Sequence, residues 1–160
     1  MSDLPKSLTI HFDGACEPNP GGWATYGWIV RDADNAAVVK TGHGVAWGPG
    51  HEYATNDMAE YAALGFALKF LADAGWNGEL SIYGDSQLVV KQVANEWACN
   101  KEHLLKARER IWALMKKISD DPVSIDWIPR EENEAADALS RVAYEQATGE
   151  KFPERKKKKR

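Results

Sequence analysis

The stretch LTIHFDG, residues 8–14, sets the first element of the fold. Leucine, isoleucine and phenylalanine alternate in it with polar residues, so one face of the segment is apolar and the other is polar. This alternation predicts a half-buried β-strand, because successive side chains of a strand point to opposite faces of the sheet. The strand pattern ends on Asp13, and residues 14–22 are rich in Gly, Pro and Asn, which predicts a turn.

The rest of the chain alternates between strand and helix patterns. Two more strands on short connections, at residues 26–31 and 37–45, predict an antiparallel meander with the first strand. Apolar spacing and capping residues then predict a helix, a strand, two helices, a strand and a final helix, at residues 55–75, 80–83, 86–93, 100–118, 123–128 and 133–144. The order βββαβααβα predicts an α/β fold: a mixed five-stranded sheet of three antiparallel strands and two more reached by helical crossovers, flanked by helices.

Composition narrows the classes of protein to consider. Of the 160 residues, 44% are hydrophobic and seven are tryptophan, which is enough for one domain with a packed core. Cys16 and Cys99 have no metal-ligand spacing and form no disulfide framework, so a reducing, cytoplasmic environment is expected. Neither a signal peptide nor a membrane-spanning run is expected, and we expect a monomer.

Charge is distributed unevenly along the chain. Residues 151–160 hold seven Lys or Arg and one Glu, a sum of +6, which leaves 13 basic and 23 acidic residues, a sum of −10, for residues 1–150. A body of this sign repels phosphate unless cations or a basic arm intervene. We predict a domain over residues 1–148 and a disordered basic tail over 149–160, in which residues 155–160 tether nucleic acid. A solubilising or targeting run, including a nuclear address, is the alternative interpretation of the tail.

Four acidic residues stand at or near the ends of predicted elements. Asp13 closes the first strand and Asp85 follows the fourth. Glu60 lies in the first turn of the first long helix, and Asp137 lies early in the last helix. A fold that gathers these ends would create one acidic pocket. Hydrolysis of a phosphodiester needs an activated water and charge relief at the leaving oxygen, and two Mg²⁺ ions about 3.5–4 Å apart on carboxylate ligands supply both.

Each of these acids also has a purely structural interpretation. Asp85 stands where a helix N-cap is expected. Glu60 and Asp137 would complement helix dipoles, and Asp13 before a glycine would open a turn. Because the chain has 24 acidic residues, spacing alone leaves both interpretations open.

The segments around the four acids carry a family resemblance. They are Asp13-Gly14-Ala15-Cys16 with Asn19-Pro20-Gly21, Thr55-Asn56-Asp57-Met58-Ala59-Glu60, Asp85-Ser86-Gln87 and Asn133-Glu134-Ala135-Ala136-Asp137-Ala138-Leu139. In this order, each in its strand or helix context, they resemble the type 1 ribonuclease H family over residues 7–146. The resemblance implies the ribonuclease H-like fold and a metal-dependent endonuclease that hydrolyses the RNA strand of RNA–DNA hybrids with little sequence specificity.

The resemblance also implies roles for individual residues. The metal ligands would be Asp13, Glu60, Asp85 and Asp137, holding two Mg²⁺ ions, with Mn²⁺ as the alternative metal. Gly14 and the loop from Cys16 to Asn19 would let the backbone approach the RNA strand. Asn56 and Gln87 match positions that meet 2′-hydroxyls, the group that distinguishes RNA from DNA. Thr55 matches the position that holds a DNA phosphate. Helix capping and an exposed helix surface are the alternative roles of Thr55, Asn56 and Gln87.

The chain departs from many family members at two places. A histidine in a longer loop before the last aspartate is missing, and Arg130 is the nearest cation to its place. Arginine cannot act as an acid or base near neutral pH, but it could neutralise phosphate or tether neighbouring glutamates. A basic protrusion between the two middle helices is also absent, because the connection at residues 96–99 is short and not basic. Both departures resemble the protrusion-less subgroup of archaeal, some bacterial and plant-type sequences.

Two other functions compete with the hybrid-cutting nuclease. Exonucleases and integrase-like enzymes of the same fold also cluster carboxylates. They would not be expected to combine Thr55, Asn56 and Gln87 with the Asn19 loop, a set that suits a hybrid. An inactive hybrid-binding module would keep the fold without cleavage. The presence of all four acids argues against this second alternative.

Overall fold

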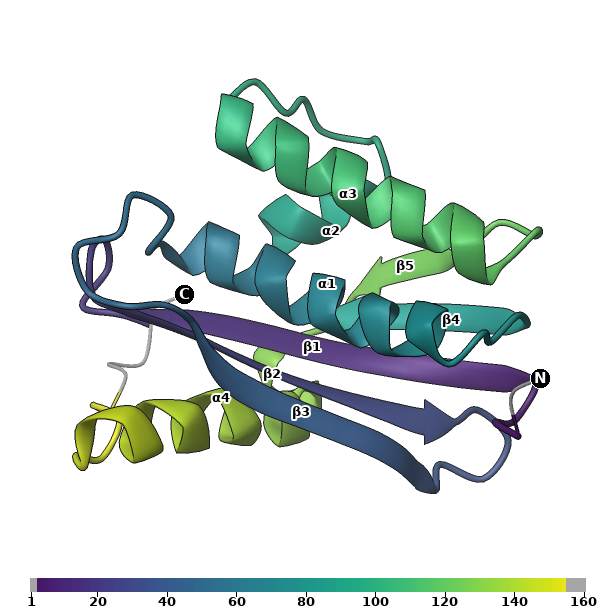
Figure 1. The fold of residues 1–160 in the computed structure, drawn as a ribbon, viewed down its shortest axis with the longest axis horizontal. Helices are drawn as coiled ribbons and strands as arrows, with labels where there is room; N and C mark the ends of the chain where they lie inside the picture. Colours follow the sequence, from purple (N-terminus) through teal and green to yellow (C-terminus); the bar gives the residue numbers. More distant parts are fainter. Residues whose placement is uncertain (1–2, 155–160) are drawn as a thin grey trace.

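The alternating segment at residues 8–13 becomes the centre of a five-stranded sheet. The computed structural model describes residues 3–154, and its strands run in the order β3-β2-β1-β4-β5 (Figure 1). The strands are β1 (Ser7–Glu17), β2 (Trp23–Asp32), β3 (Val38–Trp47), β4 (Glu79–Gly84) and β5 (Ser124–Trp127). The first three pair antiparallel, whereas β4 pairs parallel with β1 and β5 parallel with β4. The predicted mixed sheet and element order are confirmed.

The first strand is longer than the local sequence predicts. Residues 14–17 were expected to belong to a turn, but they continue β1 and pair with residues 23–26 of β2. The prediction was wrong because the ladder with β2 satisfies the backbone hydrogen bonds that a turn would otherwise satisfy locally. The small side chains of Ala15 and Cys16 fit there, since both are buried. The chain therefore turns only after Glu17.

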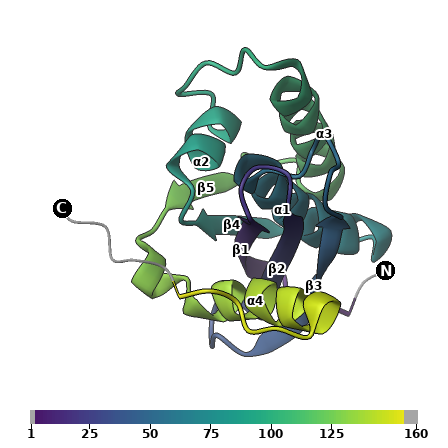
Figure 2. The same cartoon turned by 90° about the vertical axis from the view of Figure 1, so that its left-hand side faces the viewer.

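Helices cover both faces of the sheet. The helices are α1 (Asn56–Asp73), α2 (Gln87–Val93), α3 (Glu102–Ile118), the short 3₁₀ helix η1 (Arg130–Glu132) and α4 (Glu134–Thr148). In Figure 2, α1 lies on one side of the sheet and α4 on the other, with α3 stacked outside α1. Because α1 lies between the sheet and α3, its buried residues occur on several sides of the helix, from Met58 to Leu71.

The C-terminal helix extends one turn beyond the predicted end at Tyr144. It ends at Thr148, where Gly149 adopts the left-handed conformation (φ 74°) that commonly closes a helix. Residue 148, the predicted last residue of the domain, is the last residue of α4. The chain then folds back on the body, because Phe152 is buried and packs with Ala15 and Tyr144. Residues 155–160, for which a tether was predicted, lie outside the described residues.

None of the helices within residues 3–154 has the length and apolar character needed to cross a bilayer.

Candidate active site

Two of the four acids meet because their strands are neighbours. In the parallel ladder between β1 and β4, Phe12 pairs with Gly84. Asp13 and Asp85 are the next residues along these two strands. Since the carboxyl ends of parallel strands reach the same edge of a sheet, both carboxylates are delivered to one place. The interpretation of Asp85 as a helix cap is wrong, because the Ser86 hydroxyl caps α2 by accepting a hydrogen bond from the Val89 N–H at 3.2 Å.

Gly14 allows the third acid to reach the cluster. A Cβ atom at this position would lie 2.3 Å from the carbonyl carbon of Ala59 and 2.4 Å from the nitrogen of Glu60. Only glycine therefore lets the backbone of α1 approach β1 so closely. The approach of the RNA backbone to Gly14 stays a prediction. In the folded chain, the space that a side chain at this position would fill is taken by the backbone of α1. The contact places Glu60 beside Asp13. Glu60 lies in the second turn of α1, whereas it was expected in the first turn.

Asp13, Glu60 and Asp85 form a compact cluster. One carboxylate oxygen from each lies within 4.8 Å of the others. Asp13 and Glu60 are only 3% and 6% exposed, and Glu60 Oε2 is buried without a hydrogen-bond partner among the residues that the structure describes. Hard carboxylate oxygens at such separations are the ligands that divalent cations prefer. A buried oxygen without a hydrogen-bond partner is able to coordinate such a cation. The residues present therefore fit a divalent metal.

The electrostatics of the cluster also favour a cation. The pKa of Asp13 is raised to about 8, chiefly by burial and also by the nearby charge of Asp85, although a hydrogen bond with Glu60 lowers it. Burial and the charge of Asp13 raise the pKa of Glu60 well above its usual range. Like charges held together out of water favour either a proton or a positive ion between them. Without metal, the cluster retains protons near neutral pH.

Asp137 lies next to this cluster but outside the three-residue group. It occupies the first turn of α4 and contributes to the raised pKa of Asp13 through its charge and a side-chain hydrogen bond. Its Oδ2 lies 3.1 Å from Arg141 Nε in an ion pair. Its Oδ1 is buried and has no hydrogen-bond partner in the described part of the chain. The four predicted ligands thus lie together, with Asp137 as the flanking member.

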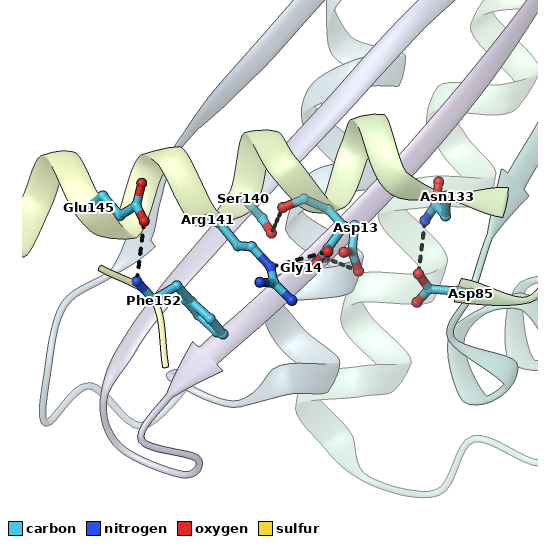
Figure 3. A network of polar contacts seen from close by, with 9 residues as sticks. Asp13, Gly14, Asp85, Asn133, Ser140, Arg141, Glu145 and Phe152 are labelled. Atoms are coloured by element: carbon cyan, nitrogen blue, oxygen red, sulfur yellow. Dashed lines mark hydrogen bonds and ion pairs between the residues drawn. The ribbon is translucent and has the colours of Figure 1, made fainter. Parts of the chain in front are cut away.

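Asn133 is a site residue that the sequence reasoning missed. Asn133 is 1% exposed, and its Nδ2 donates to the Phe12 carbonyl oxygen at 2.9 Å. The same Nδ2 donates to Asp85 Oδ2 at 3.1 Å (Figure 3). An asparagine before a helix suggests an ordinary N-cap, yet the side chain makes no cap hydrogen bond. It connects the two strand ends that carry the acids to the start of α4. The only signal in the sequence was its place at the start of the segment that carries Asp137.

Three of the expected substrate contacts bind one another. The Cys16 N–H donates to Asn56 Oδ1 at 2.7 Å, and the Asn56 N–H donates to Asn19 Oδ1 at 3.1 Å. The Cys16 thiol is buried and lies 3.2 Å from the Ala54 carbonyl oxygen, so this side chain belongs to the interior. The turn after β1 is thereby fixed to the start of α1, with the side chains of Asn19 and Asn56 exposed.

The remaining predicted residues lie around this edge. Thr55 is the N-cap of α1, and its Oγ1 accepts from the Met58 N–H at 3.2 Å. Gln87 is exposed at the first position of α2, two residues after Asp85. Arg130 lies in η1 with an exposed side chain and makes no ion pair with any residue between 3 and 154. The structure therefore shows no tether from Arg130 to its neighbouring glutamates.

The mixed sheet and the carboxylates at the ends of β1 and β4 define a metal-dependent protein of the ribonuclease H-like fold. A reverse transcriptase-like family model matches residues 11–143. The chain is 39% identical over 145 residues to the ribonuclease HI of Halobacterium salinarum, covering 91% of this chain and 68% of the relative. It belongs to the type 1 ribonuclease H family, as its motifs predicted.

Solved structures agree with this assignment. The crystal structure of the Halobacterium salinarum ribonuclease H1 superimposes with a TM-score of 0.77 at 38% identity, covering 88% of this chain and 98% of that one. A ribonuclease H1 named LC11, solved in complex with an RNA/DNA hybrid, superimposes with a TM-score of 0.78 at 26% identity, covering 88% and 98%. In a member of this family, an Asp/Glu cluster of this kind implies dependence on a divalent metal.

Proposed function

We propose that this protein is an endonuclease that hydrolyses the RNA strand of RNA–DNA hybrids, using two Mg²⁺ ions. The observation that carries the proposal is the group formed by Asp13, Glu60 and Asp85, whose oxygens lie within 4.8 Å of one another at the edge of a ribonuclease H-like sheet. Membership of the type 1 family adds the substrate class. Mn²⁺ offers similar hard-ligand chemistry and is the alternative metal.

The four carboxylates would hold the ions, and the protein would keep those carboxylates in place. When bound, divalent ions stabilise charge on the phosphate and lower the pKa of the attacking water. Asn133 fixes the orientation of Asp85 through the 3.1 Å hydrogen bond, and Gly14 keeps Glu60 next to Asp13. Because the ligands are positioned before substrate arrives, little reorganisation is needed during the reaction.

Selection for RNA would come from the amides beside the cluster. Asn56 and Gln87 are exposed at the first positions of α1 and α2, on elements that also carry or follow metal ligands. An amide can both donate to and accept from a 2′-hydroxyl, which DNA lacks. The contact with the Cys16 backbone fixes the Asn56 side chain. Because the amides would contact the sugar and not the base, little sequence preference is expected.

The DNA strand would be held at the start of α1. Thr55 Oγ1 accepts a hydrogen bond from Met58, which leaves the hydroxyl hydrogen to donate to a phosphate oxygen. The first N–H groups of a helix and its dipole add to the attraction of an anion. Arg130 precedes Asp137, in the region where many family members carry the histidine that this chain lacks. Its role would be to neutralise phosphate.

Cleavage of a uniformly labelled hybrid tests the proposal. The protein is incubated with the hybrid in Mg²⁺ and in excess chelator, alongside RNA–RNA and DNA–DNA duplexes and each single strand. Cutting of the RNA strand only in the hybrid, and only with metal, is expected. Tight binding of the hybrid without cleavage in either Mg²⁺ or Mn²⁺ would favour the inactive binding module. Comparable cutting of DNA–DNA would favour a different nuclease of the same fold.

A further inference from the structure

The segment that follows α4 is anchored close to the active site. After Gly149 the chain reverses, and Phe152 packs edge-on against Tyr144 with ring centroids 5.2 Å apart. Phe152 is 9% exposed, and its N–H donates to Glu145 Oε2 at 3.3 Å (Figure 3). The family model that matches this chain stops at residue 143, so the anchor lies beyond the part shared through that model.

Phe152 also contacts the cation that pairs with a predicted metal ligand. The guanidinium carbon of Arg141 lies 5.3 Å from the centroid of the Phe152 ring, within the range of a cation–π interaction. The Nε atom of the same guanidinium lies 3.1 Å from Asp137 Oδ2. Figure 3 shows Arg141 extending between the Phe152 ring and the carboxylates near Asp13. The Phe152 ring, the Arg141 guanidinium and the Asp137 carboxylate thus lie in a row in space, each in contact with the next.

The arrangement gives the Arg141 guanidinium two contacts, one through Nε and one through Cζ. A long side chain loses rotamer freedom when it is held in one geometry, and an exposed ion pair alone seldom repays that cost. Here the side chain of Arg141 is 34% exposed and that of Asp137 15%, and the Phe152 ring supplies a second contact surface. With Oδ2 facing Arg141, the buried Oδ1 of Asp137 has no hydrogen-bond partner among residues 3–154 and remains for a ligand.

We propose that Phe152 is a positioning residue, which orders the Arg141 guanidinium and through it orients Asp137 toward the carboxylate cluster. Residues 149–154 would then be part of the active-site architecture, with Phe152 acting through Arg141 and not on the substrate itself. The kinetic part of this inference rests on the proposed function. The structural part, order in Arg141, does not.

Substitutions at position 152 can separate positioning from simple packing. Phe152→Leu keeps an apolar side chain in the contact with Tyr144 but removes the aromatic face that Arg141 covers. Phe152→Tyr keeps the face. A chain that ends at Glu154 is the matched control for the loss of the basic tail. All three are first compared with the wild type by thermal unfolding, so that a lower stability is known before order or rates are measured.

The first readout is the mobility of Arg141 in metal-free protein. Relaxation of its ¹⁵Nε–H group should indicate a rigid side chain in the wild type, in Phe152→Tyr and in the chain ending at Glu154. In Phe152→Leu, the order parameter should fall below about 0.6, the flexible range. An Arg141 order parameter that is unchanged in Phe152→Leu overturns the proposal. Because this measurement requires no catalysis, it stands even if the protein does not cut hybrids.

The second readout is a double-mutant cycle on hybrid cleavage. Phe152→Leu and Arg141→Gln should each lower kcat several-fold with little change in KM, because both disturb a ligand and neither removes a substrate contact. The double variant should be no slower than Arg141→Gln alone, since Phe152 acts only through Arg141. Multiplicative losses would show that Phe152 acts independently of Arg141 and would overturn the proposed coupling.

Discussion

Asn133 and Asp85 are joined by a hydrogen bond of 3.1 Å, from Nδ2 of a fully buried amide to Oδ2 of a carboxylate at the active site. The two residues lie 48 positions apart in the sequence. The same Nδ2 donates to the carbonyl oxygen of Phe12, the residue before Asp13. One side chain therefore fixes the relative positions of two strand ends and a helix start.

Replacing Asn133 by alanine should impair both activity and stability. The Phe12 carbonyl oxygen would lose its donor, and Asp85 would lose the bond that orients it. We expect activity to fall about 10- to 100-fold, as for residues that support metal ligands. The free energy of unfolding should fall by about 1–3 kcal/mol. Asn77→Ala, at an exposed position, is the control for the loss of an asparagine. Wild-type turnover in Asn133→Ala would contradict the supporting role.

Asp13→Asn should abolish cleavage and leave the fold intact or more stable. The amide keeps the shape of the side chain but removes a metal ligand and a carboxyl group that must hold either a proton or a negative charge in the buried cluster. In metal-free protein near neutral pH, we expect a stabilisation on the order of 1–3 kcal/mol, because burial of the wild-type carboxyl is unfavourable to its charged form. Cleavage assays and urea denaturation in chelator measure the two effects. If the variant retains near-wild-type turnover, Asp13 is not a metal ligand.

Stability of the metal-free protein should fall as the pH rises from about 4 to 8. The pKa of the Asp13 carboxyl is 3.8 when the group is exposed and about 8 in the folded chain. The folded state therefore binds more protons than the unfolded state between these two pH values. Stability that depends on such a raised carboxyl pKa is present at low pH and is lost as the pH rises through the folded pKa. Denaturation curves in chelator at several pH values should show this slope, and Asp13→Asn should flatten it. A slope unchanged by the substitution would assign the pH dependence to other groups.

Added Mg²⁺ should counter this loss. A cation that binds only the folded state stabilises it, and it competes with protons for the same oxygens. Midpoints of thermal unfolding should therefore rise more with Mg²⁺ at pH 8 than at pH 5, and they should not respond in Asp13→Asn. Equal shifts in the wild type and the variant would place the binding of Mg²⁺ outside the cluster.

Gly14→Ala should destabilise the protein far more than an ordinary glycine substitution. The new Cβ would lie 2.3–2.5 Å from backbone atoms of Ala59 and Glu60, and backbone of a packed helix cannot yield cheaply. A loss of about 3 kcal/mol or more is expected, at the upper end of overpacking effects. Gly48→Ala is the matched control, because its Cβ would meet nothing within 4 Å. Similar unfolding midpoints for the two variants would show that α1 can move away from β1.

Removal of residues 155–160 should weaken hybrid binding in a salt-dependent way. The six Lys and Arg of this segment follow a body whose residues 1–150 carry a formal charge of −10. For each phosphate that the shortened chain no longer neutralises, the slope of log K against log salt should become shallower by about one unit. The KM should rise at low salt while kcat changes little, since Phe152 and its neighbours are retained. Identical KM values and salt slopes for both chains would support the solubility interpretation.

The sequence by itself determined the element order and the chemistry. Alternation in residues 8–13 and helical spacing in residues 56–73 are local periodicities, and they specify which side of each element must be buried. The four acids could likewise be placed at the ends of these elements, and their flanking motifs identified the family. Such patterns extend over a few neighbouring residues, so they were least reliable where an element ends, as at Glu17 and Thr148.

Only the tertiary structure decided how the acids are held. Asn133 and the carbonyl that it binds are 121 positions apart, and no local pattern distinguishes this amide from a helix cap. The raised pKa of Asp13 follows from burial and from charges brought in by other elements. The same holds for Phe152, whose position beside Arg141 depends on how the chain turns after α4. Local sequence specifies periodicity and capping, whereas burial, charge crowding and long-range hydrogen bonds exist only once distant segments pack together.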